Sequence, residues 1–111
     1  MTENPVICNS GPLIALASIG KLDLLYGLYG NIIVPEEVFK EVVEAGDGRP
    51  GALEVETLEW LQCLSLTLPP EPLLIQELGP GESAVIALAF QCNARFVLID
   101  ERRARRIAEH A

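Results

Sequence analysis

The sequence lacks the features of several protein classes. No apolar run approaches the roughly 20 residues that cross a membrane, and no basic segment precedes the apolar residues 5–19, so neither a membrane partner nor a signal peptide is expected. The three cysteines (Cys8, Cys63 and Cys92) are odd in number and far apart, and none forms a C-x-x-C pair. This usage argues against a disulfide framework and indicates a reduced, cytoplasmic protein with cysteines in its core.

Positive charge is also scarce. Eight lysines and arginines face 16 aspartates and glutamates, a formal net charge of −8. A protein that coats nucleic acid in general would present a basic surface, so this class is disfavoured. An enzyme acting on nucleic acid remains possible, because a carboxylate cluster that binds divalent cations is itself acidic and the metal faces the phosphate. Trp60, Tyr26 and Tyr29 are interpreted as packing residues, not as base-stacking platforms.

The chain is half apolar and has no low-complexity segment, so residues 1–111 are expected to form a single folded domain. Short apolar segments at residues 5–8, 31–34 and 95–99 are typical of buried strands, and residues 63–66 are a plausible peripheral strand. Helical patterns separate these strands. The alternation predicts an α/β fold with a mainly parallel central sheet.

The helices follow from apolar spacing and from glycine, proline and asparagine at their ends. Gly20 and Asn93 are expected to end helices in the left-handed conformation. The clearest loop is the glycine-rich stretch at residues 46–51. The predicted helices cover residues 13–19, 21–28, 35–44, 52–61, 73–78 and 82–90, and a last one begins near residue 101.

Polar side chains capable of chemistry recur where strands end and helices begin. Asn9 and Asp100 follow the first and last strands, Glu82 begins the most apolar helix, and Glu41 lies in the second turn of the helix after the second strand. Because such positions share the carboxyl edge of a parallel sheet, all four are expected at one rim. Three carboxylates and an amide oxygen suit Mg²⁺ or Mn²⁺ and would repel one another without a cation.

Each of these residues also has a simpler structural interpretation. Glu82 would complement a helix dipole, and Glu41 would belong to a solvated helix face. Asn9 and Asp100 would cap the helices that follow them. The coincidence of four such residues at one edge is more informative than any one of them.

Four ordered blocks of sequence carry a resemblance to a known family. They are residues 6–16 (VICNSGPLIAL, followed by GKLDLL at 20–25), 33–42 (IVPEEVFKEV), 81–89 (GESAVIALA) and 97–106 (VLIDERRARR). Together they resemble the PIN domains, in particular an uncharacterised, prokaryotic subgroup similar to VapC toxins. The resemblance spans nearly the whole chain.

The resemblance implies a three-layer α/β/α sandwich and a metal-dependent ribonuclease with a quartet of acidic residues. Asn9, Glu41, Glu82 and Asp100 would take the four catalytic and metal-binding places with Mg²⁺ or Mn²⁺, and Glu101 would be an auxiliary ligand. It also implies an RNA substrate, a cognate antitoxin protein as partner, and a homo-oligomer. Phosphate contacts would come from the arginines of the last predicted helix, whose alternative role is a solvated face: Arg102, Arg103, Arg105 and Arg106.

The sequence departs from the family pattern in two places. Position 9 is asparagine where the family has aspartate, and an amide oxygen binds a hard cation without contributing charge. The chain ends at Ala111, inside its last predicted helix, so the last family strand is expected to be missing. A missing edge strand would expose backbone and apolar surface and favour oligomerisation.

Three functional hypotheses follow. The first is a metal-dependent endoribonuclease of the toxin–antitoxin kind, favoured by Glu41, Glu82 and Asp100. The second is a catalytically weakened PIN-like binding or assembly module, favoured by Asn9 and the short C-terminus. The third is a phosphoacceptor signalling domain, which also places an aspartate at a strand end but requires an acidic pair after the first strand, where this chain has Asn9 and Ser10.

Overall fold

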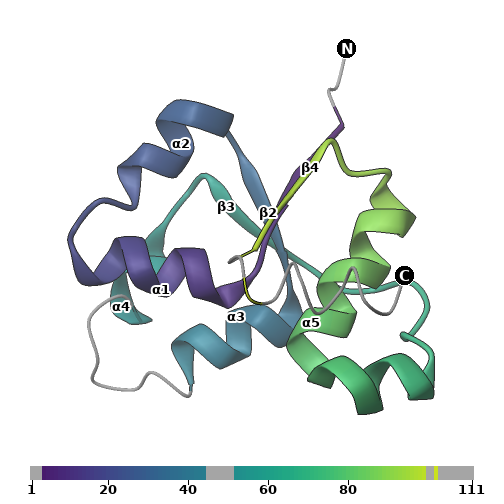
Figure 1. Cartoon of the computed structure of the whole chain (residues 1–111). Helices are drawn as coiled ribbons and strands as arrows, with labels where there is room; N and C mark the ends of the chain where they lie inside the picture. The colour runs from purple at the N-terminus through teal and green to yellow at the C-terminus, as the bar shows by residue number, and fades with distance from the viewer. Residues whose placement is uncertain (1–3, 45–51, 100–101, 103–111) are drawn as a thin grey trace.

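A computed structural model describes residues 4–44, 52–99 and 102, with the side chain of Leu53 excepted. Strands and helices alternate along the chain, as predicted (Figure 1). The elements are β1 (Val6–Cys8), α1 (Ser10–Ser18), α2 (Asp23–Tyr29), β2 (Ile32–Pro35), α3 (Glu36–Val43), α4 (Ala52–Thr57), β3 (Leu61–Leu64), α5 (Pro72–Cys92) and β4 (Phe96–Leu98).

The four described strands form one parallel sheet in the order β3-β2-β1-β4. All three residues of β1 are buried, at 1% exposed or less, which explains why this strand is continuously apolar. By contrast, β4 lies at one edge, and Phe96 is 52% exposed. The predicted α/β fold with a mainly parallel sheet is confirmed.

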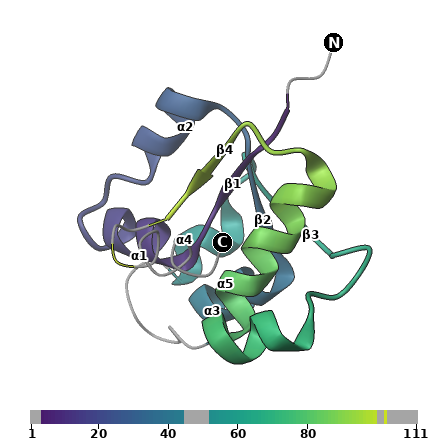
Figure 2. The same cartoon turned by 45° about the vertical axis from the view of Figure 1, so that its right-hand side comes forward.

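Helices cover the sheet on both sides. The two views place α5 on one side of the strands and α1 with α2 on the other (Figure 1 and Figure 2). The sheet order requires this arrangement: the chain steps from β1 to β2 to β3 in one direction and then crosses back to β4 beyond β1, so right-handed crossovers put the last helix on the opposite face. Helix α3 begins where β2 ends and packs against α1, α4 and α5.

Helix α5 contains a break that the sequence predicts. Gly79 has non-helical backbone angles (φ 85°, ψ 169°), and Pro80 and Gly81 follow it. The break separates a partly exposed first segment from a second segment in which Gly81 to Val85 are all buried. The predicted helix ends at Gly20 (φ 69°) and Asn93 (φ 53°) are likewise left-handed.

The length and hydropathy of α5 differ from the expectation that no apolar run in the chain is long enough to cross a membrane. Among the described helices, α5 is long and apolar enough to cross a membrane by length and composition alone, although no such run was expected. The Gly79 break interrupts it, and its buried face contacts β1, β2 and α3. Packing against the sheet therefore accounts for the apolar residues of this buried face, whereas Phe90 of the same helix is 83% exposed.

Two predicted boundaries were wrong. The helix expected over residues 52–61 ends at Thr57, and the strand expected over residues 63–66 is β3, Leu61–Leu64. Leu61 is buried and pairs with Ile32, so sheet pairing takes it out of the helical pattern. Residues 46–51, and the last predicted helix apart from Arg102, lie outside the described residues.

The cysteines should differ in reactivity. Burial raises the pKa of the Cys8 thiol to about 12, although a backbone hydrogen bond at Leu13 acts against this shift. Cys63 is exposed, and its pKa is raised by partial burial and then by Glu36 and Glu37. At pH 8, iodoacetamide should label Cys63 in the native protein and leave Cys8 unlabelled, as judged by mass spectrometry of peptides.

A urea-unfolded sample is the control and should be labelled at both positions. Labelling of native Cys8 as fast as Cys63 would contradict this prediction. The same shift affects stability: the unfolded thiol ionises above its ordinary pKa of 9.0, while the folded thiol stays protonated up to about 12. The Cys8 contribution to the free energy of unfolding is therefore present below pH 9.0 and falls as the pH rises toward 12.

Candidate active site

Asn9 lies at the point where the sheet order reverses. It follows β1 directly, and its backbone N–H donates to the carbonyl oxygen of Leu98 (2.9 Å), which joins the carboxyl ends of β1 and β4. The crossovers from β1 to β2 and from β2 to β3 run to one side of β1, and the crossover from β3 to β4 returns to its other side, so the switch point of the sheet lies between β1 and β4. In open α/β sheets, ligands bind outside the carboxyl ends of strands at such a point.

The Asn9 side chain is buried and unsatisfied. It occupies the N-cap position of α1 but makes no capping hydrogen bond, so the simpler interpretation of Asn9 as a side-chain cap is not borne out. The residue is 0% exposed, and neither Oδ1 nor Nδ2 has a hydrogen-bond partner within residues 4–44, 52–99 and 102. An unsatisfied buried amide costs about 1–3 kcal/mol, and no hydrogen bond from the described residues offsets this cost at Asn9.

Glu82 is a buried acid in the first turn after the α5 break. It is 1% exposed and precedes Ser83, whose hydroxyl donates to the carbonyl oxygens of Gly79 (2.6 Å) and Pro80 (3.2 Å). These bonds fix the start of the second helical segment. A carboxylate this deep is unlike the solvated acids that complement helix dipoles at a surface.

Glu41 reaches the same turn from α3. A Cβ atom at Gly81 would lie 2.7 Å from Cδ of Glu41 and would also overlap both carboxylate oxygens. The carboxylate of Glu41 therefore lies directly against the backbone of the residue that precedes Glu82. Glu41 is half-buried, so the interpretation as a fully solvated helix face is wrong for this side chain.

Three of the predicted site residues can thus be placed. Asn9 is at the carboxyl end of β1, and the Glu41 carboxylate lies against Gly81, the residue that precedes Glu82. Figure 1 shows α3 at the end of the sheet where β1 and β2 finish, with α5 beside it. Arg102 is exposed. The remaining predicted site residues lie outside the described part of the chain: Asp100, Glu101, Arg103, Arg105 and Arg106.

The donor chemistry fits a hard divalent cation. Two carboxylates and an amide oxygen without a hydrogen bond are the oxygen ligands that Mg²⁺ and Mn²⁺ prefer. Within the described residues, no three acidic, histidine or cysteine side chains gather in one group, so no assembled metal site is seen in that part of the chain. Asn9, Glu41 and Glu82 are the predicted ligands that lie within it.

Two features of this region were not predicted. Gly81 was interpreted only as part of a helix stop, whereas its missing side chain makes room for Glu41. Glu37, one turn before Glu41, was not among the predicted site residues, but its Oε1 is buried and has no hydrogen-bond partner among the described residues. The four-residue spacing of Glu37 and Glu41 was the available signal for Glu37.

The steric role of Gly81 can be tested with a double-mutant cycle. In Gly81→Ala the new methyl group should displace the Glu41 carboxylate. In a Glu41→Ala background the carboxylate is absent, so the methyl group should fit without displacing it. Urea unfolding should therefore show Gly81→Ala to be less favourable in the wild-type background, by about 0.5 kcal/mol or more.

The matched control is Gly27→Ala in α2, because a Cβ there meets nothing within 4 Å. Its effect should be the same with and without Glu41. Additive effects of Gly81→Ala and Glu41→Ala would show that the two residues are not in contact.

The cost of the buried Asn9 amide is also measurable. Asn9→Leu keeps the number and branching of side-chain heavy atoms and removes two unsatisfied polar atoms. We expect the free energy of unfolding to rise by about 1 kcal/mol in urea denaturation, since replacing an unpaired buried polar group relieves its desolvation penalty. A loss of stability would mean that the amide has partners in solution.

The comparisons with known proteins identify the family. A family model described as DUF3368, PIN domain, matches residues 5–111. No curated protein and no solved structure matches the chain significantly. The match covers almost the whole sequence, and the parallel sheet in the order β3-β2-β1-β4 flanked by helices is consistent with it. The chain therefore belongs to the PIN-domain family.

Proposed function

We propose that this chain is a metal-dependent ribonuclease of the toxin–antitoxin kind that hydrolyses RNA phosphodiester bonds. The observation that carries the proposal is the buried Asn9 amide, which has no hydrogen-bond partner among the described residues and lies at the switch point of the sheet. Membership of the PIN family and the meeting of Glu41 with the Gly81–Glu82 turn support it.

The site residues have distinct roles in this proposal. Glu41 and Glu82 supply negative charge to hold Mg²⁺ or Mn²⁺, and the Asn9 oxygen is a neutral ligand; Asp100 and Glu101 complete the set. When bound, the cation polarises the phosphoryl oxygen and lowers the pKa of the attacking water. Asn9 Nδ2 is a donor and would orient a phosphate oxygen, since it has no described protein acceptor.

Hydrogen bonds of the surrounding fold hold Asn9 and Glu82 in fixed positions. Asn9 is held by its backbone bond to Leu98, and Glu82 by the Ser83 bonds that fix the start of its helical segment. Side chains on such elements keep their geometry without reorganising during the reaction. The low exposure of Asn9 and Glu82 also keeps bulk water from screening their charges and dipoles.

A second candidate is a PIN-like binding or assembly module with weakened catalysis. One observation favours it: position 9 carries an amide, which adds no negative charge to the site. A neutral ligand lowers affinity for a divalent cation relative to a carboxylate. Cleavage measured together with metal binding therefore separates the two candidates.

The proposal includes partners. RNA would contact Arg102 and the neighbouring arginines, whose positive charges suit phosphate. An antitoxin protein and a second copy of the chain are the proposed protein partners, in the cytoplasm. The exposed Phe90 (83%) near the end of α5 and Val97 (36%) in the edge strand β4 support association of copies through apolar surface.

The proposed activity predicts a defined pattern of RNA cleavage. With Mg²⁺ or Mn²⁺ the wild type should cut a mixed RNA pool, while Glu82→Gln and Asp100→Asn should each reduce the rate by at least about a hundredfold, because each removes a charge that holds the cation. Glu56→Gln in α4 is the control, since it removes an equal charge from an exposed position and should cut at the wild-type rate.

Calorimetric titration with Mn²⁺ should follow the same order, and Asn9→Asp should bind Mn²⁺ more tightly than the wild type. Absence of metal-dependent cleavage, or equal cleavage by all variants, would refute the ribonuclease. Mn²⁺ binding without cleavage would identify the weakened module instead.

A further inference from the structure

The edge strand β4 is more apolar than its position in the sheet requires. Its residues Phe96, Val97 and Leu98 are all apolar, and Phe96 and Val97 are exposed. The other edge strand, β3, exposes the polar Gln62 and the small Cys63 instead. Edge strands of soluble proteins commonly carry charged or polar residues that prevent pairing with another chain. β4 therefore has the composition of an interior strand at the edge of the described sheet.

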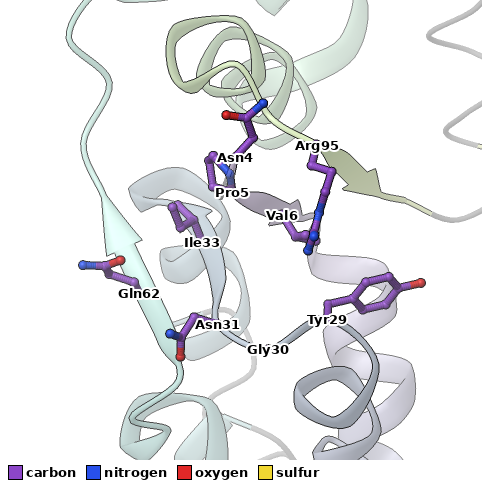
Figure 3. Close-up of a pocket in the computed structure, with 9 residues that line it drawn as sticks. All are labelled: Asn4, Pro5, Val6, Tyr29, Gly30, Asn31, Ile33, Gln62 and Arg95. Carbon is purple, nitrogen blue, oxygen red and sulfur yellow. The ribbon is translucent and has the colours of Figure 1, made fainter. Parts of the chain in front are cut away.

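An apolar hollow of about 380 Å³ adjoins this edge. Its helical side is a stripe along the end of α5 with spacing i, i+3, i+4 and i+7, and its strand side is Val97 with the neighbouring Ile99. The lining residues are Ile86, Ala89, Phe90, Asn93, Ala94, Val97 and Ile99. Among these described residues only Asn93 is polar, and none is charged. A larger hollow at the amino ends of the strands differs, because polar side chains such as Asn31 and Gln62 line it (Figure 3).

The backbone of β4 also presents hydrogen-bonding groups at this edge. The carbonyl oxygen of Leu98 accepts from the N–H of Asn9 (2.9 Å), so the backbone groups of Leu98 point toward β1. Neighbouring residues of a strand direct their backbone groups to opposite sides. The N–H and C=O of Val97 therefore point away from β1, where the described sheet has no further strand. An added strand would bond to these groups.

Two copies of this edge are complementary to each other. In a twofold dimer, identical edge strands run antiparallel. Pairing centred on Val97 would let its N–H and C=O bond to the same groups of the partner's Val97. The same register sets Phe96 opposite the partner's Leu98, so each exposed β4 side chain meets an apolar one. On the α5 side of the sheet, the two apolar hollows would meet across the paired strands.

Two phenylalanines supply a large share of the apolar area that such an interface needs. Phe90 and Phe96 are 83% and 52% exposed. Since a buried aromatic side chain removes about 150–250 Å² from water, these rings from two copies would contribute roughly 400–700 Å². Specific interfaces bury about 1,200–2,000 Å² in total. The strand backbone and the other residues of the hollow would supply the remainder.

The distribution of charge also favours a second copy over a charged partner. None of the described residues that line the hollow is charged, so pairing there buries no unpaired ion. Each copy carries a net charge of −8, and salt screens the repulsion between copies. Association should therefore strengthen as the salt concentration rises. Residues 100–111 are mostly charged and contain one large aliphatic residue, Ile107, so their composition does not match this apolar edge.

We propose that two copies of the chain associate through antiparallel pairing of their β4 strands, which joins their four-stranded sheets into one. This inference rests on the association of copies proposed above, and it names the surface and the strand register. No residue of the candidate active site lines the hollow. Because the paired strands run in opposite directions, the two candidate active sites would lie at opposite edges of the joined sheet.

Sedimentation velocity of the full chain tests the association. The wild type should form dimers within the micromolar concentration range. Phe90→Glu should weaken the dimer by at least about a hundredfold, because it places a charge in the apolar interface and enters that interface twice. Leu73→Glu is the matched control: Leu73 lies in the first segment of α5 and is 65% exposed. Its dimer affinity should stay within about twofold of the wild type.

Hydrogen exchange of the ¹⁵N-labelled chain locates the interface. The Val97 amide should exchange more slowly as the protein concentration rises from low to high micromolar, because pairing protects it. Phe90→Glu should lose this protection. The amide of Cys63, in the other edge strand, is the control and should exchange at the same rate at every concentration.

A wild type that stays monomeric at high micromolar concentration would overturn both this inference and the proposed association of copies. Equal weakening by Phe90→Glu and Leu73→Glu, or a dimer without protection of Val97, would overturn this inference alone. Protection of Val97 in a monomer would also overturn it, since another part of the chain would then cover the edge. If Phe90→Glu does not fold, as judged by its ¹⁵N spectrum, the Val97 protection in the wild type decides. None of these measurements uses metal or RNA, so the ribonuclease proposal is tested separately.

Discussion

Burial of β1 on both faces is the constraint on which the rest of the structure depends. The strand pairs with β2 on one side and β4 on the other, and helices cover both faces of the sheet. A chain leaving the carboxyl end of such a strand is still inside the molecule. Asn9 is therefore fully buried because of its position after Cys8, and its hydrogen-bonding groups must find partners in the interior or remain without them.

The second constraint is the break in α5, where two glycines are required for different reasons. Gly79 adopts a positive φ that other residues rarely tolerate, so a new helical segment starts deep in the fold. Gly81 lies in helical conformation and is required for space, because the Glu41 carboxylate occupies the volume of its missing side chain. Together they bring acids from α3 and α5 to one turn, although these acids are 41 residues apart in the chain.

The fold follows largely from local patterns. The apolar segments before Asn9 and after Asn31 predict strands because their residues are apolar in succession, as burial on both faces requires. The boundary at Leu61 could not be predicted, since pairing with Ile32 decides it and pairing partners are not visible in one segment. The strand order could not be predicted either, because it too depends on which strands pair.

The candidate site was only partly predictable. The position of Asn9 after a strand and of Glu82 at a helix start indicates that the two share an edge, but burial of their side chains depends on packing between distant elements. The contact of Glu41 with Gly81 is likewise a property of two helices seen together.

The asparagine at position 9 suits a fully buried position. An aspartate there would bury a full charge, and burying an ionised carboxylate costs several kcal/mol unless it is paired. The amide avoids this penalty at the smaller cost of hydrogen-bonding groups that have no partner among the described residues. In the proposed metal site, this position would therefore favour folding before a cation binds and would contribute less to the binding of that cation.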